Sequence, residues 1–231
     1  MLSWGAVRII GEYEITVMVT DEPWLENCYL VRHVSSGELV LIDPGWNAAE
    51  IAQVVLAHGG KISAIWITHA HHDHLGAVGA LQERFGVSSC MHRKDERLLR
   101  QAATYALVFA QRQMLSLDGV LLFGEDAVLT LGGEKVEVLA SPGHTPGGVC
   151  YCFKGFVFTG DSLLFRHIGR TDTPGGDRAA LVVSVERLFG LCVEDTVLFP
   201  GHGRAWTLKE ARGWWRSAGG EPPEYKSFGG I

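Results

Sequence analysis

Short blocks of apolar and β-branched residues open the chain, and their spacing predicts β-strands. Residues 7–10, 13–19 and 27–31 form three such blocks, and turn-forming residues separate them. Residues 38–42 form a fourth block, and its run of apolar side chains is typical of a strand buried on both faces. The first forty or so residues therefore predict a β-sheet.

Helical patterns then alternate with one more strand. Asn47, with Glu50 three positions later, resembles a capping box and predicts a helix that Gly59 and Gly60 end. Residues 62–67 are the next apolar strand. A second helix is predicted after it from apolar residues at helical spacing, which are Leu75, Val78, Leu81 and Phe85. This alternation predicts a β-α-β-α unit with parallel strands.

Residues 95–117 are free of proline and glycine and carry a stripe of apolar side chains at helical spacing. One interpretation is a helix, or a pair of helices, packed on the core. The other is a cover over the mouth of an active site.

The second half of the chain again places strands before helices. Four apolar or alternating blocks predict antiparallel hairpins, at residues 128–131, 135–140, 149–153 and 156–159. A helix, a short strand and a last helix are predicted at residues 178–189, 197–199 and 208–216. Two such halves predict an α/β fold in which two mixed β-sheets form a sandwich flanked by helices, in a single domain over residues 1–231.

Composition and charge narrow the classes of partner. The chain is 47% hydrophobic and 20% charged with 29 glycines, which is typical of a turn-rich globular protein. A net charge of −6 disfavours a nucleic-acid partner held by its phosphates. We therefore expect a small-molecule substrate and neither a nucleic-acid nor a membrane partner, and the oligomeric state stays open.

Cysteine usage and the N-terminus bear on the compartment. Of the five cysteines only Cys150 and Cys152 are close in sequence, and alternate positions on a strand point to opposite faces. We therefore expect free thiols in a reducing compartment. Residues 1–8 lack the pattern of a signal peptide, and no apolar stretch is long enough to span a membrane, so we expect a cytoplasmic protein.

The candidate chemistry lies directly after the apolar strand that ends at Ile67. His69, His71, Asp73 and His74 follow it, and loops at the carboxyl ends of strands are where α/β folds bind ligands. Imidazole nitrogens and carboxylate oxygens are ligands of Zn²⁺, Fe and Mn. Four such side chains within six residues cannot share one face of a regular helix or strand, so they indicate a metal site.

Motifs along the chain extend this cluster. The segment Thr68-His69-Ala70-His71-His72-Asp73-His74 resembles the T-H-x-H-x-D-H signature of the metallo-β-lactamase superfamily, whose members fold as an αββα sandwich. Three later segments are similar to further motifs of that family, namely 141–147 around His144, 159–162 around Asp161 and 200–203 around His202.

The resemblance implies a set of metal ligands. One ion would be held by His69, His71 and His144, and a second by Asp73, His74 and His202, with Asp161 bridging both. The expected ions are two divalent transition metals, with zinc favoured and iron or manganese as alternatives.

The resemblance also implies a mechanism. A pair of metal ions can lower the pKa of a bridging water towards 7 and present the resulting hydroxide to a substrate carbonyl. Asp73 is the expected catalytic carboxylate, which would orient the water and carry its proton. Asp43, in an Asp-Pro-Gly turn, is expected to be a partner of a ligand and not a ligand itself.

Residues 160–177 are similar to the glyoxalase II-like branch of the family, which implies a thioester substrate of the hydroxyacylglutathione type. Only residues 204–231 follow the last ligand motif, whereas glyoxalase II enzymes carry a helical domain there that helps to hold glutathione. We therefore expect a weak requirement for glutathione. Arg170 and Asp172 are expected to form an ion pair behind the site.

Other functions remain open. Sulfur (persulfide) dioxygenases of the same superfamily share the segment around Arg170 but use one iron, through positions that correspond to His69, His144 and Asp161. A lactone hydrolase of the same fold is another alternative. A non-catalytic binding module is disfavoured, because all seven candidate ligands are present.

Overall fold

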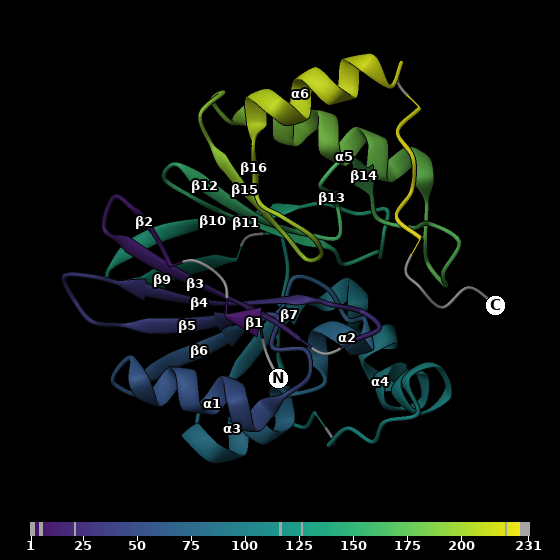
Figure 1. The fold of residues 1–231 in the computed structure, drawn as a ribbon. Helices are drawn as coiled ribbons and strands as arrows, with labels where there is room; N and C mark the ends of the chain where they lie inside the picture. Colours follow the sequence, from purple (N-terminus) through teal and green to yellow (C-terminus); the bar gives the residue numbers. More distant parts are fainter. Residues whose placement is uncertain are drawn as a thin grey trace.

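The computed structural model describes residues 3–4, 7–20, 22–115, 117–125, 127–219 and 221–226. Two β-sheets lie face to face, and helices cover the outer face of each (Figure 1). Both sheets contain parallel and antiparallel pairs of strands. The predicted sandwich of two mixed sheets flanked by helices is confirmed.

The first sheet has eight strands in the order β1-β3-β4-β5-β6-β7-β8, with β2 paired to β3. The strands are β1 (Ser3–Trp4), β2 (Arg8–Ile10), β3 (Tyr13–Val19), β4 (Asn27–His33), β5 (Leu39–Ile42), β6 (Ile62–Trp66), β7 (Ser89–His92) and β8 (Leu121–Phe123). The predicted parallel β-α-β-α unit is confirmed, because β5, β6 and β7 are neighbours that run in the same direction.

The second sheet has six strands in the order β16-β15-β12-β11-β10-β9. They are β9 (Val128–Leu131), β10 (Glu134–Ala140), β11 (Val149–Phe153), β12 (Phe156–Gly160), β15 (Val197–Pro200) and β16 (Trp206–Thr207). The predicted antiparallel hairpins are confirmed in the pairs β9–β10, β10–β11 and β11–β12. A separate small hairpin joins β13 (Leu163–Leu164) to β14 (His167–Ile168).

Helices pack on the outer faces and on the seam between the sheets. They are α1 (Ala48–Ala57), α2 (His72–Leu75), α3 (Val78–Phe85), α4 (Glu96–Tyr105), α5 (Arg178–Leu191) and α6 (Leu208–Ser217), with a 3₁₀ turn η1 (Arg93–Asp95) and a π-helical turn η2 (Ala106–Ala110). In Figure 1 α1 and α3 lie below the first sheet, and α5 and α6 lie above the second. No helix of the described residues is long and apolar enough to cross a membrane.

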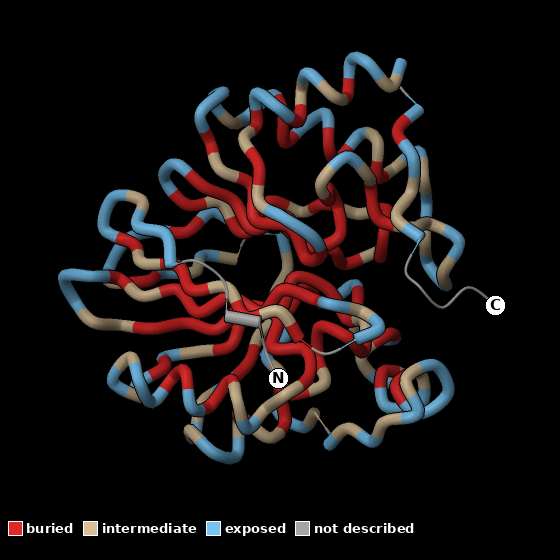
Figure 2. The backbone as a smooth tube through the Cα atoms, in the orientation of Figure 1, coloured by how far each residue is buried: buried red, intermediate tan, exposed pale blue. Residues whose placement is uncertain are grey.

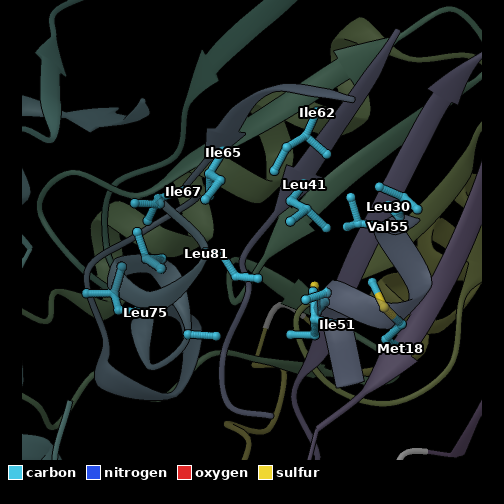
Figure 3. Close-up of a cluster of buried hydrophobic side chains, with 14 of the residues drawn as sticks. Met18, Leu30, Leu41, Ile51, Val55, Ile62, Ile65, Ile67, Leu75 and Leu81 are labelled. Carbon is cyan, nitrogen blue, oxygen red and sulfur yellow. The ribbon is translucent and has the colours of Figure 1, made fainter. Parts of the chain in front are cut away.

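Buried side chains form three layers, and the central strands of both sheets are largely buried (Figure 2). Figure 3 shows the lower layer, where Ile51 and Val55 of α1 face Leu30 and Leu41 of the first sheet. The layer between the sheets is rich in aromatic rings, including Tyr13, Tyr29, Trp66, Tyr151, Phe153, Phe156, Phe158 and Phe199.

Two local predictions are wrong. Helical structure after Asp95 ends at Ala110 and does not continue to Leu117, because Gln111 takes a left-handed conformation with φ of 52°. Asn47 precedes α1 but makes no capping hydrogen bond from its side chain, since its own φ is 66°. The side-chain and backbone pairing expected there occurs instead at the start of α6, between Thr207 and Glu210.

Candidate metal centre

Every predicted ligand follows the carboxyl end of a strand, and these strand ends meet between the two sheets. His69 and His71 lie in the loop after β6, and Asp73 and His74 lie in the short helix α2 that continues it. The other three come from the second sheet, where His144 follows β10, Asp161 follows β12 and His202 follows β15.

The structure brings six of these seven side chains together as two clusters. One ligand atom from each of His69, His71 and His144 lies within 4.8 Å of the others. The same limit holds for Asp73, His74 and His202. The two clusters are the two sets that the sequence resemblance implied.

Asp161 lies between the clusters. Its Oδ2 atom is 3.6 Å from Nε2 of His144 in the first cluster and 3.5 Å from Nε2 of His202 in the second. Its Oδ1 atom is 3.5 Å from Nε2 of His74. A carboxylate in this position can donate one oxygen to each of two ions.

Several of these atoms are buried and lack partners. Among the residues that the structure describes, the Nε2 atoms of His69, His74 and His144 and the Oδ1 atom of Asp161 have no hydrogen-bond partner. Buried polar atoms are almost always paired, so four unpaired atoms that converge on one place require an explanation. A nitrogen and oxygen donor set of this kind suits divalent transition metals, and the residues present fit two such ions.

The other ring nitrogens of these histidines are held from outside the cluster. Nδ1 of His144 is 2.7 Å from the carbonyl oxygen of Arg170, and Nδ1 of His202 is 2.9 Å from that of Trp24. A carbonyl oxygen only accepts, so each Nδ1 carries the proton and each Nε2 is left free to bind a metal.

Asp43 orients His74 and the loop before it. Its carboxylate accepts hydrogen bonds from the backbone N–H of Thr68 at 2.7 Å and from the Thr68 hydroxyl at 2.6 Å. Its Oδ2 atom is also 3.0 Å from Nδ1 of His74. Asp43 lies within 4.8 Å of ligand atoms of His69 and His74, but these bonds occupy its oxygens and place it on the outer side of the His74 ring. This geometry fits the predicted partner role.

Burial and charge shift the pKa values of the candidate ligands in opposite directions. Burial, together with the neighbouring imidazoles, lowers the pKa of His69 well below its ordinary value, so the ring is neutral at pH 7. Burial also disfavours charge on His74, but Asp161 and other carboxylates hold its pKa well above the usual range. Burial opposes ionisation of Asp73, yet the hydrogen bond from His202 and the nearby imidazoles hold its pKa well below the usual range. Binding of a metal at the second cluster must therefore release protons.

Two glycines allow the strand ends to approach closely. A Cβ atom at Gly201 would lie 2.2 Å from Oδ1 of Asp161, and one at Gly169 would lie 2.8 Å from Nδ1 of His144. Any larger residue at either position would displace a candidate ligand.

Two tyrosines of the inner aromatic layer hold the loops from below. The Tyr151 hydroxyl donates to the carbonyl oxygen of Ile67, directly before the histidine motif, at 2.7 Å. The Tyr29 hydroxyl donates to the carbonyl oxygen of Pro200, directly before the turn that carries His202. The core and the site are thus joined through two phenols.

Sequence reasoning missed two buried carboxylates. Asp95 is fully buried and accepts hydrogen bonds from the backbone N–H of Ala70 and of Gly147 and from the hydroxyl of Thr145. It therefore ties the loop of His69 and His71 to the loop of His144. Glu26 is also fully buried, with Oε1 3.9 Å from Nδ1 of His74. Both residues follow turn-like local sequences, where a carboxylate is usually exposed, so no local signal marks them.

Three residues of the sequence motifs lie outside the clusters. Arg170 and Asp172 form the expected ion pair, with Nε to Oδ1 at 2.7 Å, but both side chains are exposed. His72 turns away from the ligand atoms and packs edge-on against Trp24, with ring centroids 5.1 Å apart.

Comparison with known proteins places these features in a family. The model of the metallo-beta-lactamase superfamily matches residues 21–202. The chain is similar to a probable polyketide biosynthesis zinc-dependent hydrolase of Bacillus subtilis (strain 168), with 26% identity over 179 residues that cover 78% of this chain and 73% of the relative. It is also similar to the hydroxyacylglutathione hydrolase GloC of Haemophilus influenzae, with 30% identity over 196 residues that cover 81% and 90%.

Solved structures show the same fold. The chain is similar to the crystal structure of BLEG-1 B3 metallo-beta-lactamase, with a TM-score of 0.79, 29% identity and coverage of 86% of this chain and 96% of that chain. It is similar to TTHA1623 in a di-iron-bound form, with a TM-score of 0.75, 35% identity and coverage of 84% and 96%. These relatives indicate a hydrolase, and the chain belongs to the metallo-beta-lactamase superfamily, whose members bind divalent metals.

Proposed function

We propose that this protein hydrolyses thioesters of the hydroxyacylglutathione type at a two-metal centre. His69, His71 and His144 would hold one ion, and Asp73, His74 and His202 would hold the other. The observation that carries the proposal is the place of Asp161, whose carboxylate lies within 3.6 Å of Nε2 atoms from both clusters.

Two divalent ions held there would lower the pKa of a water molecule and polarise a substrate carbonyl oxygen. The carboxylate of Asp73 would accept a proton from that water and pass it to the leaving group. Its Oδ2 atom is 3.4 Å from Nε2 of His202, so this carboxylate lies among the candidate ligands and beside the ions that they would hold. Water adds to the carbonyl carbon, Asp73 accepts a proton from it, the C–S bond breaks, and the leaving thiolate takes that proton.

Two observations support a thioester as the substrate. Residues 160–177 are similar to the glyoxalase II-like branch, and the relative from Haemophilus influenzae, which aligns over 90% of its own length, is a hydroxyacylglutathione hydrolase. Zinc is the proposed metal, in line with the zinc-dependent relative. The similar structure in a di-iron-bound form makes iron the competing choice.

A mononuclear iron dioxygenase is the second candidate function. His69, His144 and Asp161 supply a two-histidine, one-carboxylate face, which suits Fe(II) and O₂ chemistry. This assignment leaves the buried, unpaired Nε2 atom of His74 without a role, because His74 belongs to the other cluster. We therefore favour the hydrolase.

The deciding experiment compares the unmutated protein with His202→Ala. Both are loaded with zinc or with iron, and metal content, thioester hydrolysis and oxygen uptake with glutathione persulfide are measured. We expect His202→Ala to lower kcat/KM for thioester hydrolysis by roughly 100-fold or more, because the second ion loses a ligand. His58→Ala is the matched control, since this imidazole lies 3.4 Å from Glu14 and belongs to neither cluster.

The outcomes separate the candidates. Rapid oxygen uptake that persists in iron-loaded His202→Ala, without thioester hydrolysis, would establish the dioxygenase. A lactone and a β-lactam are assayed in parallel, and faster hydrolysis of either would replace the thioester as the substrate class while leaving the metal centre in place.

A further inference from the structure

The chain segment after α6 returns to the candidate metal centre. Residues 221–226, here called the C-terminal strap, descend from the end of α6 past β14 (Figure 1). The backbone N–H of Tyr225 donates to the carbonyl oxygen of Ile168 at 2.7 Å, and that of Ile168 donates to the carbonyl oxygen of Pro223 at 3.0 Å. The strap therefore pairs with β14 as a short parallel bridge.

Glu224 fixes the strap to the loop that supports His144. Its carboxylate accepts hydrogen bonds from the backbone N–H of Thr171 at 3.1 Å, from the Thr171 hydroxyl at 2.7 Å and from Arg178 at 2.9 Å. Arg178 also donates to the carbonyl oxygen of Pro222 at 2.8 Å. These bonds set the position of the next residue, Tyr225.

Tyr225 lies on a candidate ligand of the second ion. Its ring stacks on the ring of His202, with centroids 5.3 Å apart and an interplanar angle of 20°. Nε2 of the same His202 ring lies 3.4 Å from Oδ2 of Asp73 and 3.5 Å from Oδ2 of Asp161.

The hydroxyl of Tyr225 has no hydrogen-bond partner among the residues that the structure describes, and the residue is partly exposed. Stacking on His202 needs only the ring, which phenylalanine would also supply. A polar atom held at the rim of the site, and left without a protein partner, is available to a substrate.

We propose that Tyr225 is a specificity-determining residue that contacts the substrate. Its ring forms a wall of the binding site beside His202, and its hydroxyl donates a hydrogen bond to a carbonyl or carboxylate oxygen carried by the substrate next to the reacting thioester. The preferred substrates are thus thioesters whose acyl or thiol half bears such an acceptor. This inference rests on the proposed thioester hydrolysis.

The test compares two pairs of small thioesters with unmutated protein, Tyr225→Phe and Tyr225→Ala. In the first pair the thiol half is N-acetylcysteamine, which has an amide carbonyl, or butanethiol, which has none. In the second pair the acyl half is succinyl, which has a carboxylate, or butyryl. Lys226→Ala, an exposed neighbour in the same strap, is the control.

We expect the unmutated protein to favour the acceptor-bearing member of at least one pair. Tyr225→Phe should reduce that kcat/KM ratio by about 3- to 10-fold, the worth of one hydrogen bond, with no change in metal content. Lys226→Ala should leave the ratio unchanged.

Three results would overturn the inference. One is an unchanged ratio in both pairs. Another is an equal loss of activity on all substrates together with loss of metal, which would mean that Tyr225 only steadies His202. The third is that unmutated, metal-loaded protein hydrolyses no thioester, which would refute both the proposed function and this inference. Normal hydrolysis with unaltered ratios in Tyr225→Phe would refute the role of Tyr225 alone.

Discussion

Nδ1 of His74 lies 3.0 Å from Oδ2 of Asp43, and both side chains are almost completely buried. The backbone of Asp43 is left-handed, with φ of 47°, a conformation that costs a non-glycine residue of order 1–3 kcal/mol. The fold accepts this cost at a position where the carboxylate orients a candidate ligand. A side chain that fixes the far nitrogen of an imidazole also strengthens its binding to a metal.

Replacing Asp43 with alanine should weaken zinc binding by about 10- to 100-fold, because His74 loses the group that fixes its ring. The affinity is measured by competition with a chromophoric chelator. Asp172→Ala removes an exposed carboxylate and serves as the control. Equal zinc affinity in the two variants would contradict an orienting role for Asp43.

Asp161 should determine how many ions the protein holds. We expect unmutated protein to retain about two transition-metal ions per chain after dialysis, and Asp161→Ala to retain about one or fewer, because the carboxylate between the clusters is lost. Elemental analysis against protein concentration gives the ratio. One tightly bound iron in the unmutated protein would instead support the mononuclear candidate.

Asp95 should be important for stability as well as for the site. Asp95→Ala leaves the N–H groups of Ala70 and Gly147 and the hydroxyl of Thr145 without their buried acceptor. We expect the free energy of unfolding to fall by about 4 kcal/mol, measured with urea. Asp118→Ala changes an exposed carboxylate and should stay within about 0.5 kcal/mol of the unmutated protein. A similarly small loss in Asp95→Ala would show that the two loops are held in another way.

Cys150 should make the protein sensitive to alkaline pH. Burial raises the pKa of this thiol from 9.0 to about 11. Above pH 9 the unfolded chain loses the proton while the folded protein keeps it, so the contribution to stability is complete below pH 9 and is lost as pH rises to about 11. Relative to Cys150→Ala, the unmutated protein should lose about 2 kcal/mol of unfolding free energy between pH 8 and pH 11. Unfolding curves that shift in parallel for the two proteins would refute the assignment.

Residues that act within one short segment are predictable from sequence. His69, His71, Asp73 and His74 directly follow an apolar strand, and the three later motifs repeat that arrangement, so strand ends and ligands could be predicted together. The main strands were also predictable, because a block of apolar residues indicates from its own sequence that it is buried. The short strands β7 and β8 carry too few residues to form a pattern.

Residues whose role depends on distant parts of the chain are not predictable in this way. The burial of Glu26 results from its packing against His74 and the 43–45 turn, and that of Asp95 from loops 25 and 50 or more residues away. The end of the helix at Ala110 illustrates the same limit, because residues 107–109 are apolar but more than half exposed. Only the tertiary structure decides which part of an apolar stripe is covered.

The phenols of Tyr29 and Tyr151 make the aromatic layer between the sheets part of the support for the metal-ligand loops. Each ring belongs to the core that joins the sheets, and each hydroxyl supports the base of a ligand-bearing loop. A substitution that repacks this layer therefore alters ligand geometry even when it leaves folding intact. In evolutionary terms, the core of this protein is under selection for ligand geometry as well as for stability, because a substitution in it must also keep the ligand-bearing loops in place.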